Sequence, residues 1–285
     1  MNSELPKKTI EYLHARKARG QKISSLTCYD YPTALLEERA GIDIALVGDS
    51  LGTNVLGYSS EREVTMDDIV HHLKAVKRGI STAYLLADLP FRSYETTTQA
   101  LTNATRLVQA GADGVKLEGS RVEIVRYLHS HGLQVWGHLG LNPQLHEKMA
   151  LQAKTADAAL QLVRDAADLE QAGICGLILE MIPEVVGRVV TERVHVPTIG
   201  IGAGRYTDGQ VLIAQDLLGV NSFDLRHVTR YDDLATRIVA AFRRYAEDVE
   251  AANFPGAGNV RHLAPAEHNK LMDLLGEHAS KPLGK

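Results

Sequence analysis

Three features that mark whole classes of protein are missing from this sequence. There are only two cysteines, Cys28 and Cys175, in no CxxC spacing, so we exclude a disulfide scaffold and a zinc knuckle and expect a reducing compartment. No run of about 18 or more apolar residues occurs, so we predict no membrane-spanning helix. The formal net charge is −4 with acids and bases interleaved, so the sequence lacks the basic excess of a nucleic-acid-binding protein.

A signal sequence is a fourth missing feature. The first ten residues, MNSELPKKTI, contain no apolar stretch, so we expect a cytoplasmic protein. What is present is a chain of 285 residues with 45% hydrophobic and 23% charged residues, a composition typical of a globular protein that buries a core without disulfides. This length suits a single (β/α)8 barrel, which needs about 250 residues.

Short apolar segments alternate with amphipathic helices from residue 22 onward. The helical stretches 96–112, 121–132 and 155–173 end at or near glycine, which favours the left-handed end of a helix. This alternation predicts a parallel sheet with right-handed crossovers. The predicted strands are 22–28, 44–48, 83–87, 114–117, 134–137, 176–179, 197–201 and, with the weakest pattern, 220–223.

Seven clear units and one weaker unit favour an α/β fold of the (β/α)8 or TIM-barrel type, with an open doubly wound sheet as the alternative. We predict one barrel domain, 22–254, preceded by an N-terminal helix, 1–21, and followed by a tail, 255–285. The segment 7–23 carries many basic residues, which we assign to the solvated face of a helix that closes the bottom of the barrel.

Ionisable side chains follow five neighbouring strands, at the end of the barrel where (β/α)8 active sites form. Lys116 and Glu118 are two residues apart on one strand, so their side chains point to the same face. A carboxylate that faces a barrel axis is costly unless it is paired or binds metal, so the set predicts one joint site. In strand order the candidates are Asp49, Ser50, Asp88, Lys116, Glu118, His138 and Glu180.

Asp49, Asp88 and Glu118 come from consecutive strands and can meet at one point. Three carboxylates without imidazole or thiolate suit a hard cation, Mg²⁺ first, with Mn²⁺ and Co²⁺ as alternatives. A second interpretation is an internal salt-bridge network in which Lys116 neutralises the carboxylates. A third is a class I aldolase in which Lys116 forms a Schiff base with the substrate.

His138 and Glu180 are the candidates for contact with the reacting atoms. His138 is either a buried structural histidine or a hydrogen-bond donor to the substrate. Glu180 ends the apolar strand LILE with no basic residue beside it, which suits a general base, and helix capping is its alternative role.

At these residues the sequence resembles the ketopantoate hydroxymethyltransferase family. The resemblance implies hydroxymethyl transfer from 5,10-methylenetetrahydrofolate to 3-methyl-2-oxobutanoate through a Mg²⁺-bound enolate, giving 2-dehydropantoate in pantothenate biosynthesis. It also implies a homo-oligomer, often a decamer. The matching motifs run in order between residues 22 and 256: TCYDYPTA, LVGDSLG, HHLKAVKRG, LLADLPF, AGADGVKLEG, GHLGLNPQ, LILEMIP, PTIGIGAG with TDGQ, and NFPG.

The resemblance assigns a role to each candidate residue. Asp49, Asp88 and Glu118 would surround one Mg²⁺ per subunit. Glu180 would accept the C3 proton of the 2-oxo acid. The 2-oxo acid itself would be bound by Asp49, Ser50, Asp88, Lys116 and His138.

The segment 145–160 is the main departure from the family pattern. The family carries a glycine-rich loop over the site here, whereas this chain is a few residues shorter and lacks those glycines. We therefore predict that activation of the 2-oxo acid is retained and that transfer from the folate is the weaker activity. The alternative function is a divergent metal-dependent 2-oxo acid aldolase or lyase of the isocitrate lyase and phosphoenolpyruvate mutase type.

Overall fold

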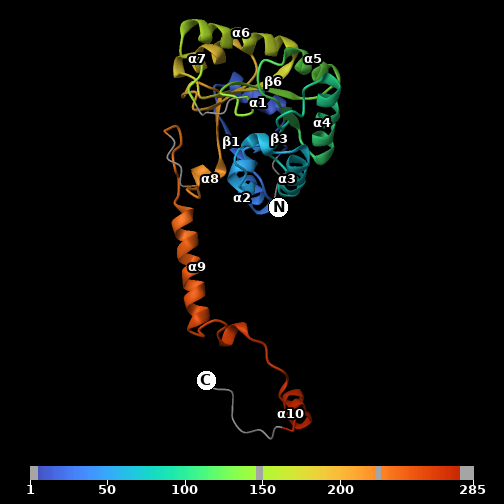
Figure 1. Cartoon of the computed structure of the whole chain (residues 1–285), viewed down its shortest axis with the longest axis vertical. Coiled ribbons are helices and arrows are strands. Elements are labelled where there is room, and N and C mark those ends of the chain that lie inside the picture. The colour runs from blue at the N-terminus through green and yellow to red at the C-terminus, as the bar shows by residue number, and fades with distance from the viewer. Residues whose placement is uncertain (1–5, 146–149, 222–225, 277–285) are drawn as a thin grey trace. The chain divides into compact units, whose positions relative to one another are not determined.

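A closed barrel of eight parallel strands forms the centre of the protein (Figure 1). The computed structural model describes residues 6–145, 150–221 and 226–276. Each strand pairs with the next along the chain, and β8 pairs with β1, so the predicted (β/α)8 barrel is confirmed and the open sheet is wrong. The strands are β1 (Ile23–Thr27), β2 (Ile44–Val47), β3 (Tyr84–Asp88), β4 (Gly114–Lys116), β5 (Val135–Gly140), β6 (Ile174–Glu180), β7 (Thr198–Ile201) and β8 (Gly209–Leu212).

Helices surround the strands on the outside of the barrel (Figure 1). The three clearest predicted helices are confirmed as α4, α5 and α6. Thr96 and Thr155 cap the starts of α4 and α6 with their side chains, and Gly111 and Gly173 end them in the left-handed conformation. The helices are α1 (Ile10–Ala18), α2 (Tyr31–Ala40), α3 (Met66–Gly79), α4 (Thr97–Ala110), α5 (Val122–Ser130), α6 (Ala156–Ala172), α7 (Glu184–Arg193), α8 (Ala214–Leu217), α9 (Leu234–Glu250) and α10 (Pro265–Leu274).

The eighth strand lies earlier in the chain than predicted. We placed it at 220–223, but β8 is Gly209–Leu212, Val220 and Asn221 are not in a strand, and 222 and 223 lie outside the described residues. Parallel neighbours usually need a crossover of a dozen or more residues, whereas only the loop 202–208 joins β7 to β8. Gly209 fits this tight closure, because a Cβ there would lie 2.4 Å from the carbonyl oxygen of Ile23 in β1.

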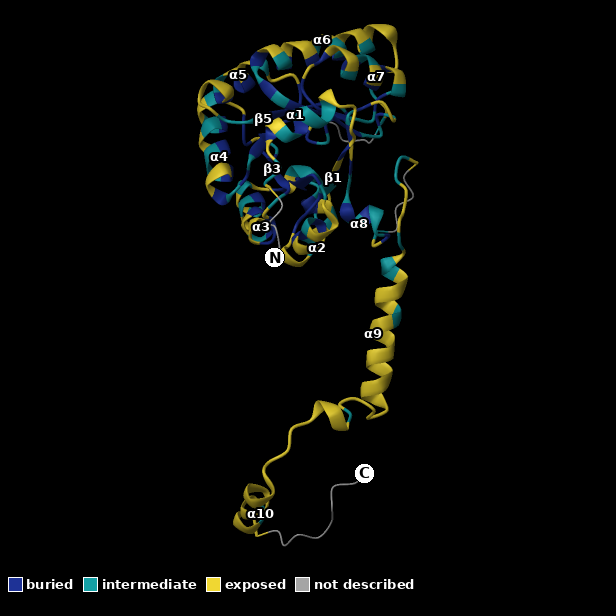
Figure 2. Cartoon of the chain, turned by 180° about the vertical axis from the view of Figure 1, so that it is seen from behind, coloured by how far each residue is buried: buried dark blue, intermediate teal, exposed yellow. Residues whose placement is uncertain are grey.

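The predicted N-terminal helix is present as α1 and packs against the amino-terminal end of the barrel. Its residues Ile10 and Leu13 belong to the same buried apolar cluster as Trp136 and Tyr84 inside the barrel. Trp136 fits closely, because a Cβ on Gly176 would lie 2.5 Å from its ring. A second, larger apolar cluster lies between the strands and the surrounding helices. Figure 2 shows buried residues of the barrel in dark blue.

The lysines around α1 are paired, which corrects the prediction of a solvated basic face. Lys7, Lys8 and Lys17 lie 2.5, 3.2 and 2.8 Å from carboxylate oxygens of Asp113, Asp43 and Asp208, respectively. These aspartates immediately precede β4, β2 and β8. The N-terminal segment is therefore bonded to the starts of three strands in different parts of the sequence.

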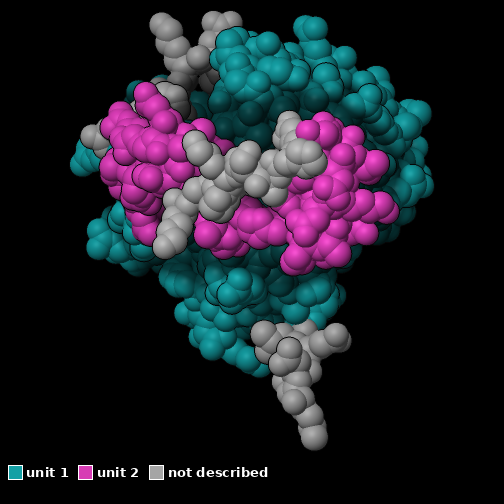
Figure 3. Space-filling model, turned by 90° about the horizontal axis from the view of Figure 1, so that it is seen from below, with its two compact units in different colours: residues 1–232 teal, residues 233–285 magenta. Residues whose placement is uncertain are grey.

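The chain divides into two compact units, Met1–Asp232 and Asp233–Lys285 (Figure 3). The boundary after Asp232 assigns α9 to the second unit, whereas the predicted barrel domain ends at residue 254. None of the residues of α9, all of which the structure describes, is buried, and Figure 2 shows them in the colours of exposed and intermediate residues. Throughout the described residues, no helix combines the length and the apolar character needed to cross a membrane.

Glu37 on α2 is a buried carboxyl group outside the strand-end cluster. It is 5% exposed, and neither of its oxygens has a hydrogen-bond partner among the described residues. Burial raises the pKa of Glu37 to about 8, against a smaller lowering by the nearby Cys28 thiol. The next residue, Glu38, accepts hydrogen bonds from Ser81 and from the Thr82 backbone, which outweigh its desolvation and lower its pKa to about 2.

We predict that Glu37→Gln increases the free energy of unfolding. Folded Glu37 keeps its proton at pH values where the unfolded chain has lost it, so its presence lowers stability as pH rises from the unfolded pKa to about 8. The gain over the parent should grow through that window, by at most about 1.4 kcal/mol for each pH unit. Urea denaturation at several pH values measures it.

Glu38→Gln is the matched control on the same helix and should behave in the opposite way. Its carboxylate stabilises the fold above the unfolded pKa, and this contribution disappears as pH falls toward its folded pKa of about 2. The variant should therefore be less stable than the parent at neutral pH. If the Glu37→Gln variant instead became less stable relative to the parent as pH rises through this window, the Glu37 carboxylate would have to be charged and paired in the folded parent.

Candidate active site

The seven predicted site residues line one cavity of about 100 Å³ at the carboxyl-terminal end of the barrel. Asp88, Lys116 and Glu180 are the last residues of β3, β4 and β6. Asp49 and Glu118 follow β2 and β4 by two residues, and His138 lies within β5. Asp49, Asp88, Lys116, Glu118 and His138 are each at most 5% exposed, so their charges interact with little screening by water.

Lys116 lies at the centre of the cluster. Its Nζ atom is 3.1 Å from Asp88 Oδ2, 3.9 Å from Glu118 Oε1 and 3.3 Å from His138 Nδ1. Burial disfavours the charged amine, but the attraction of Asp88, Glu118 and Asp49 outweighs it and raises the pKa of Lys116. A Schiff-base lysine needs a lowered pKa, so this environment does not favour the class I aldolase interpretation.

Asp49 and Asp88 form a like-charged pair beside this lysine. The Asp49 backbone N–H donates to Asp88 Oδ2 at 3.1 Å, whereas Asp88 Oδ1 has no hydrogen-bond partner among the described residues. Burial, and then the charges of Asp88 and Glu118, raise the pKa of Asp49 well above its usual value. Burial also raises the pKa of Asp88, although Lys116 opposes this. Their buried position therefore disfavours the charged form of both aspartates.

His138 lies between two carboxylates. Its Nδ1 is 3.4 Å from Glu118 Oε1, and its Nε2 is 3.2 Å from Glu180 Oε2, although out of line for a hydrogen bond. Burial and Lys116 lower the pKa of His138, but the contacts with Glu118 and Glu180 outweigh them and raise it to about 9. For Glu118, burial raises the pKa, but the contact with His138 and the charge of Lys116 bring it below its usual value.

The backbone around Glu180 is held closely by β5. Gly140 is paired with Glu180 in the barrel and has a φ of 99°, and a Cβ on it would lie 2.1 Å from the Glu180 carbonyl oxygen. The Leu141 N–H donates to the same oxygen at 2.9 Å. The following residue, Met181, has a φ of 48°, which is uncommon for a residue other than glycine. The end of β6 is thus fixed where Glu180 enters the cavity.

Three residues that we did not predict from the sequence form hydrogen bonds with or around the cluster side chains. Gln144, which is fully buried, donates from Nε2 to Asp49 Oδ2 at 2.6 Å, and its Oε1 accepts from the Tyr94 hydroxyl. Tyr29 Oη lies 2.7 Å from Ser50 Oγ. Each follows the end of a strand in the sequence, after β5, β3 and β1, and that position is the signal that could have indicated them.

Part of the cavity lining is apolar. These residues lie on β2, β6, β7 and β8 or directly after β8, so the closing strand contributes to the site. A ligand that fits the cavity would therefore have a polar end and a hydrocarbon end. The apolar lining residues are Leu46, Ile178, Ile201, Val211, Leu212 and Ile213.

The carboxylates are suited to a hard cation but do not form a ready-made cage. Within the described residues, no group of three or more His, Cys, Asp or Glu side chains has an arrangement that could hold a metal ion. Mg²⁺ commonly uses one or two carboxylates and takes its other ligands from water and substrate. Asp49 and Asp88 fit that role, because Asp88 Oδ1 is unpartnered among the described residues and like charges crowd Asp49.

Glu118 is less available as a direct ligand than the two aspartates. Its Oε2 accepts from the Gln144 backbone N–H at 3.1 Å, and its Oε1 faces His138 and Lys116. The assignment of Glu118 to the metal stays a prediction.

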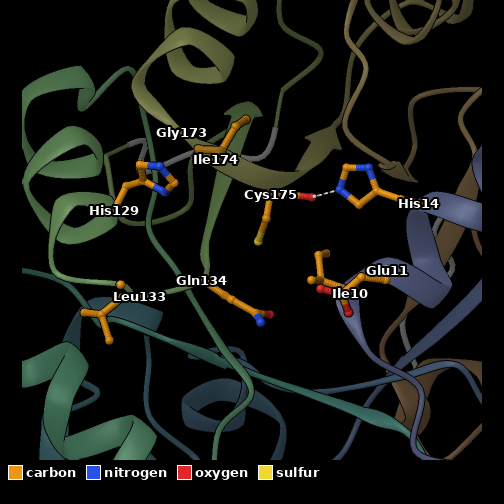
Figure 4. Close-up of a pocket in the computed structure, with 10 residues that line it drawn as sticks. Ile10, Glu11, His14, His129, Leu133, Gln134, Gly173, Ile174 and Cys175 are labelled. Atoms are coloured by element: carbon orange, nitrogen blue, oxygen red, sulfur yellow. Dashed lines mark hydrogen bonds between the residues drawn. The ribbon is translucent and has the colours of Figure 1, made fainter.

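A larger cavity, of about 590 Å³, lies at the amino-terminal end of the barrel, near the starts of α1 and β6 (Figure 4). Figure 4 shows His14 and His129 on opposite sides of it. His14 Nε2 is 3.2 Å from the Cys175 carbonyl oxygen, and the Cys175 thiol donates to the Val135 carbonyl oxygen. Burial raises the pKa of Cys175 to about 12, so its thiol is not activated. The smaller cavity is therefore the candidate active site.

The structure describes only part of the segment 145–160, in which the sequence departs from the family pattern. Residues 146–149 lie outside the described residues, and α6 begins at Ala156. The Gln152 N–H donates to the Met181 carbonyl oxygen at 2.8 Å, which joins this segment to the end of β6. The predicted effect of the segment on folate transfer stays a prediction.

Solved structures support the fold. A 2,3-dimethylmalate lyase of the PEP mutase/isocitrate lyase superfamily matches 94% of this chain and 98% of its own, with a TM-score of 0.57 and 14% identity. A phosphonopyruvate hydrolase matches 95% of both chains, with a TM-score of 0.57 and 12% identity. At these identities the likeness shows a common barrel architecture.

Proteins of similar sequence identify the family to which the chain belongs. The family model described as ketopantoate hydroxymethyltransferase matches residues 7–257. The 3-methyl-2-oxobutanoate hydroxymethyltransferase of Moorella thermoacetica is 46% identical over 255 residues, 87% of this chain and 95% of the relative. The enzyme of the same name from Thermus thermophilus is 46% identical over 248 residues, 85% of this chain and 95% of the relative. The chain therefore belongs to the ketopantoate hydroxymethyltransferase family, whose members are hydroxymethyl-transferring enzymes.

Proposed function

We propose that this chain transfers a hydroxymethyl group from 5,10-methylenetetrahydrofolate to 3-methyl-2-oxobutanoate, giving 2-dehydropantoate in pantothenate biosynthesis. The observation that carries the proposal is the cavity at the strand ends, whose lining combines a cluster of charged residues, including Glu180, with a set of apolar side chains. The names of the relatives, which are 46% identical, support the same acceptor.

The charged and the apolar lining residues match the two ends of a branched 2-oxo acid. Its carboxylate and 2-oxo oxygens would lie toward Ser50 and Lys116, which offer a hydroxyl and an ammonium group. Its isopropyl group would pack against apolar lining residues such as Ile178, Ile201 and Val211. Burial of about three hydrocarbon groups contributes roughly 2 kcal/mol of binding free energy and favours a branched acid over a short one.

We propose Mg²⁺ as the cofactor, with Asp49 and Asp88 as the residues that would hold it. The Asp88 Oδ1 atom, which has no partner among the described residues, and the raised pKa of Asp49 support this. A bound divalent cation would be a partner for Asp88 Oδ1 and would stabilise the charged form of Asp49. Five carboxylates line the cavity together with two bases, Lys116 and His138, which leaves an excess of negative charge for a cation; the carboxylates are Asp49, Glu61, Asp88, Glu118 and Glu180. When bound, Mg²⁺ would polarise the 2-oxo group and so acidify the C3 proton.

Glu180 would then accept the C3 proton as a general base. Its carboxylate enters the cavity from the end of β6, and His138 lies 3.2 Å from Glu180 Oε2, where it can stabilise the carboxylate before it takes the proton. Lys116, held charged by its neighbours, would stabilise the negative charge that develops on the substrate oxygen. The carbon nucleophile would attack the one-carbon unit of the folate, water would supply the hydroxyl oxygen, and tetrahydrofolate would be released.

We also propose a homo-oligomer, and by family resemblance a decamer. The exposed apolar residues Ile238, Phe242, Tyr245 and Val249 recur on one face of α9, with Phe242 68% exposed. An apolar stripe of this kind on a helix without buried residues is typical of an association surface.

A cytoplasmic location remains part of the proposal. Both cysteines lie in the described part of the chain and are free, which agrees with a reducing compartment.

Glu180→Gln tests the general base. The variant should bind 3-methyl-2-oxobutanoate nearly as well as the parent and slow exchange of its C3 proton with D₂O by about 10²-fold or more, the usual contribution of a general base. Proton NMR in the presence of Mg²⁺ measures the exchange, and added 5,10-methylenetetrahydrofolate lets the same spectra report formation of 2-dehydropantoate. Glu184→Gln, at an exposed carboxylate bonded to Arg205, is the control.

Two results would count against this assignment. Exchange by Glu180→Gln at the parent rate would move the base elsewhere, with His138 the next candidate. Exchange by the parent without any transfer from the folate would reject the hydroxymethyl transfer and favour a 2-oxo acid lyase or aldolase.

Asp88→Asn tests the metal. We expect Mg²⁺ affinity, measured by calorimetry, to fall by about 10-fold or more while circular dichroism shows a folded protein. The asparagine keeps an acceptor for the Asp49 N–H but loses the charge that attracts the cation. Asp30→Asn, which preserves a capping side chain at the start of α2, should leave the affinity unchanged. Equal affinities of parent and Asp88→Asn would remove Asp88 from the metal site.

Phe242→Glu tests the association surface. A charge in the middle of the apolar stripe should disfavour burial against another subunit and lower the molar mass measured by light scattering. Arg244→Glu, on the other side of α9, should keep the mass of the parent. A monomeric parent would refute the homo-oligomer, and an unchanged Phe242→Glu assembly would place the interface on another surface.

A further inference from the structure

Gln144 lies behind the charged cluster without lining the cavity. It follows β5 by four residues and is 0% exposed. Its side chain and its backbone N–H contact the carboxylates of Asp49 and Glu118, which come from different strands. A neutral residue that joins two of the three cluster carboxylates is placed to decide how they are oriented.

The hydrogen bonds around Gln144 allow only one orientation of its amide. The Glu118 N–H donates to Tyr94 Oη at 3.3 Å, so the Tyr94 hydroxyl hydrogen is left to donate to another atom. That atom is Gln144 Oε1, because a carbonyl oxygen only accepts hydrogen bonds. Gln144 Nε2 then faces Asp49 Oδ2 at 2.6 Å and the Leu89 carbonyl oxygen at 3.1 Å. Two amide hydrogens meet two acceptors, so the reversed amide would leave both acceptors without a donor.

This arrangement distinguishes the two oxygens of each contacted carboxylate. Gln144 engages Oδ2 of Asp49 through its side chain and Oε2 of Glu118 through its backbone at 3.1 Å. Gln144 makes no hydrogen bond with the other two oxygens, Oδ1 of Asp49 and Oε1 of Glu118, so these remain available to other groups in the cluster. A charge-assisted hydrogen bond in a fully buried setting is strong enough to hold a carboxylate in one rotamer.

We propose that Gln144 is a positioning residue for the reaction: with Tyr94 it fixes the Asp49 carboxylate in the orientation that binds the cation and the 2-oxo acid. The inference rests on the proposed function, since it assumes that Asp49 takes part in that binding. Gln144 acts through Asp49 and needs no contact with substrate.

Gln144→Met and Tyr94→Phe test this role in different ways. The first keeps the side-chain volume and removes the donor to Asp49. The second removes the hydroxyl that orients the amide, which is also the acceptor of the Glu118 N–H. We expect Gln144→Met to weaken Mg²⁺ binding, measured by calorimetry, by about 10 to 100-fold, the usual effect of losing a residue that orients a metal ligand. Tyr94→Phe should cause a smaller loss, and the double variant should bind no more weakly than Gln144→Met alone.

Gln134→Met is the matched control, since Gln134 Oε1 accepts from the Tyr84 hydroxyl at the other end of β5. It removes the same kind of tyrosine–glutamine bond and should lower thermal stability without changing Mg²⁺ affinity. Binding of 3-methyl-2-oxobutanoate in the presence of Mg²⁺ should follow the cation, with a raised dissociation constant only in the Gln144 and Tyr94 variants.

The outcomes separate this inference from the proposed function. Parent-like Mg²⁺ and 2-oxo acid affinities in a folded Gln144→Met variant overturn the positioning role alone, as do strictly additive losses in the double variant. A parent that binds neither ligand overturns both proposals. If Gln144→Met does not fold, Tyr94→Phe decides: a weakened Mg²⁺ affinity at unchanged thermal stability supports the role, and an unchanged affinity rejects it.

Discussion

The buried ammonium group of Lys116 is the interaction on which the rest of the site depends. Asp49, Asp88 and Glu118 are almost entirely shielded from water, and burying an ion costs several kcal/mol unless a partner offsets it. Lys116 reaches Asp88 and Glu118 directly and is itself kept charged by them. Burial, and then the charges of Asp88 and Glu118, still raise the pKa of Asp49. Lys116 therefore stabilises the cluster without compensating every carboxylate in it.

The aspartates at the two ends of the barrel differ in how completely they are paired. At the amino-terminal end, Asp43, Asp113 and Asp208 each face a lysine and also accept backbone N–H groups, from Ser24, Leu85 and Thr198. At the carboxyl-terminal end, Asp88 keeps an oxygen without a partner among the described residues. Complete pairing stabilises the fold, whereas incomplete pairing leaves capacity for a ligand. Residues of one chemical type are thus fully paired at one end of the barrel and only partly paired beside the candidate site at the other.

The sequence predicted the residues whose position follows from strand geometry. Asp88, Lys116 and Glu180 could be found because parallel strands in a barrel end at one rim, so apolar segments with a polar last residue identify them. The eighth strand was misplaced because β7 and β8 are joined without a helix, which breaks the alternation on which the prediction rested. The metal role of the carboxylates remains untested.

The contacts made by loops could not be predicted in the same way. Gln144 and Tyr94 lie in loops after β5 and β3, and their meeting depends on how two irregular segments fold over the strand ends. Neither periodicity nor strand register reports such a contact. The lysines of the N-terminal segment were assigned to solvent for a similar reason, since their partners are distant in the sequence.

Those distant partners have a consequence for the order of folding. Lys17 pairs with Asp208, 191 residues later in the chain, and Asp208 immediately precedes the strand that closes the barrel. During synthesis the chain emerges amino end first, so α1 is made long before its last partner exists. Pairing β8 with β1 likewise closes a loop of almost the whole barrel, with the entropy cost that this carries. The first helix of the protein therefore completes its ion pairs among the last, although the apolar partners of Ile10 and Leu13, which include Tyr84 and Trp136, are made earlier.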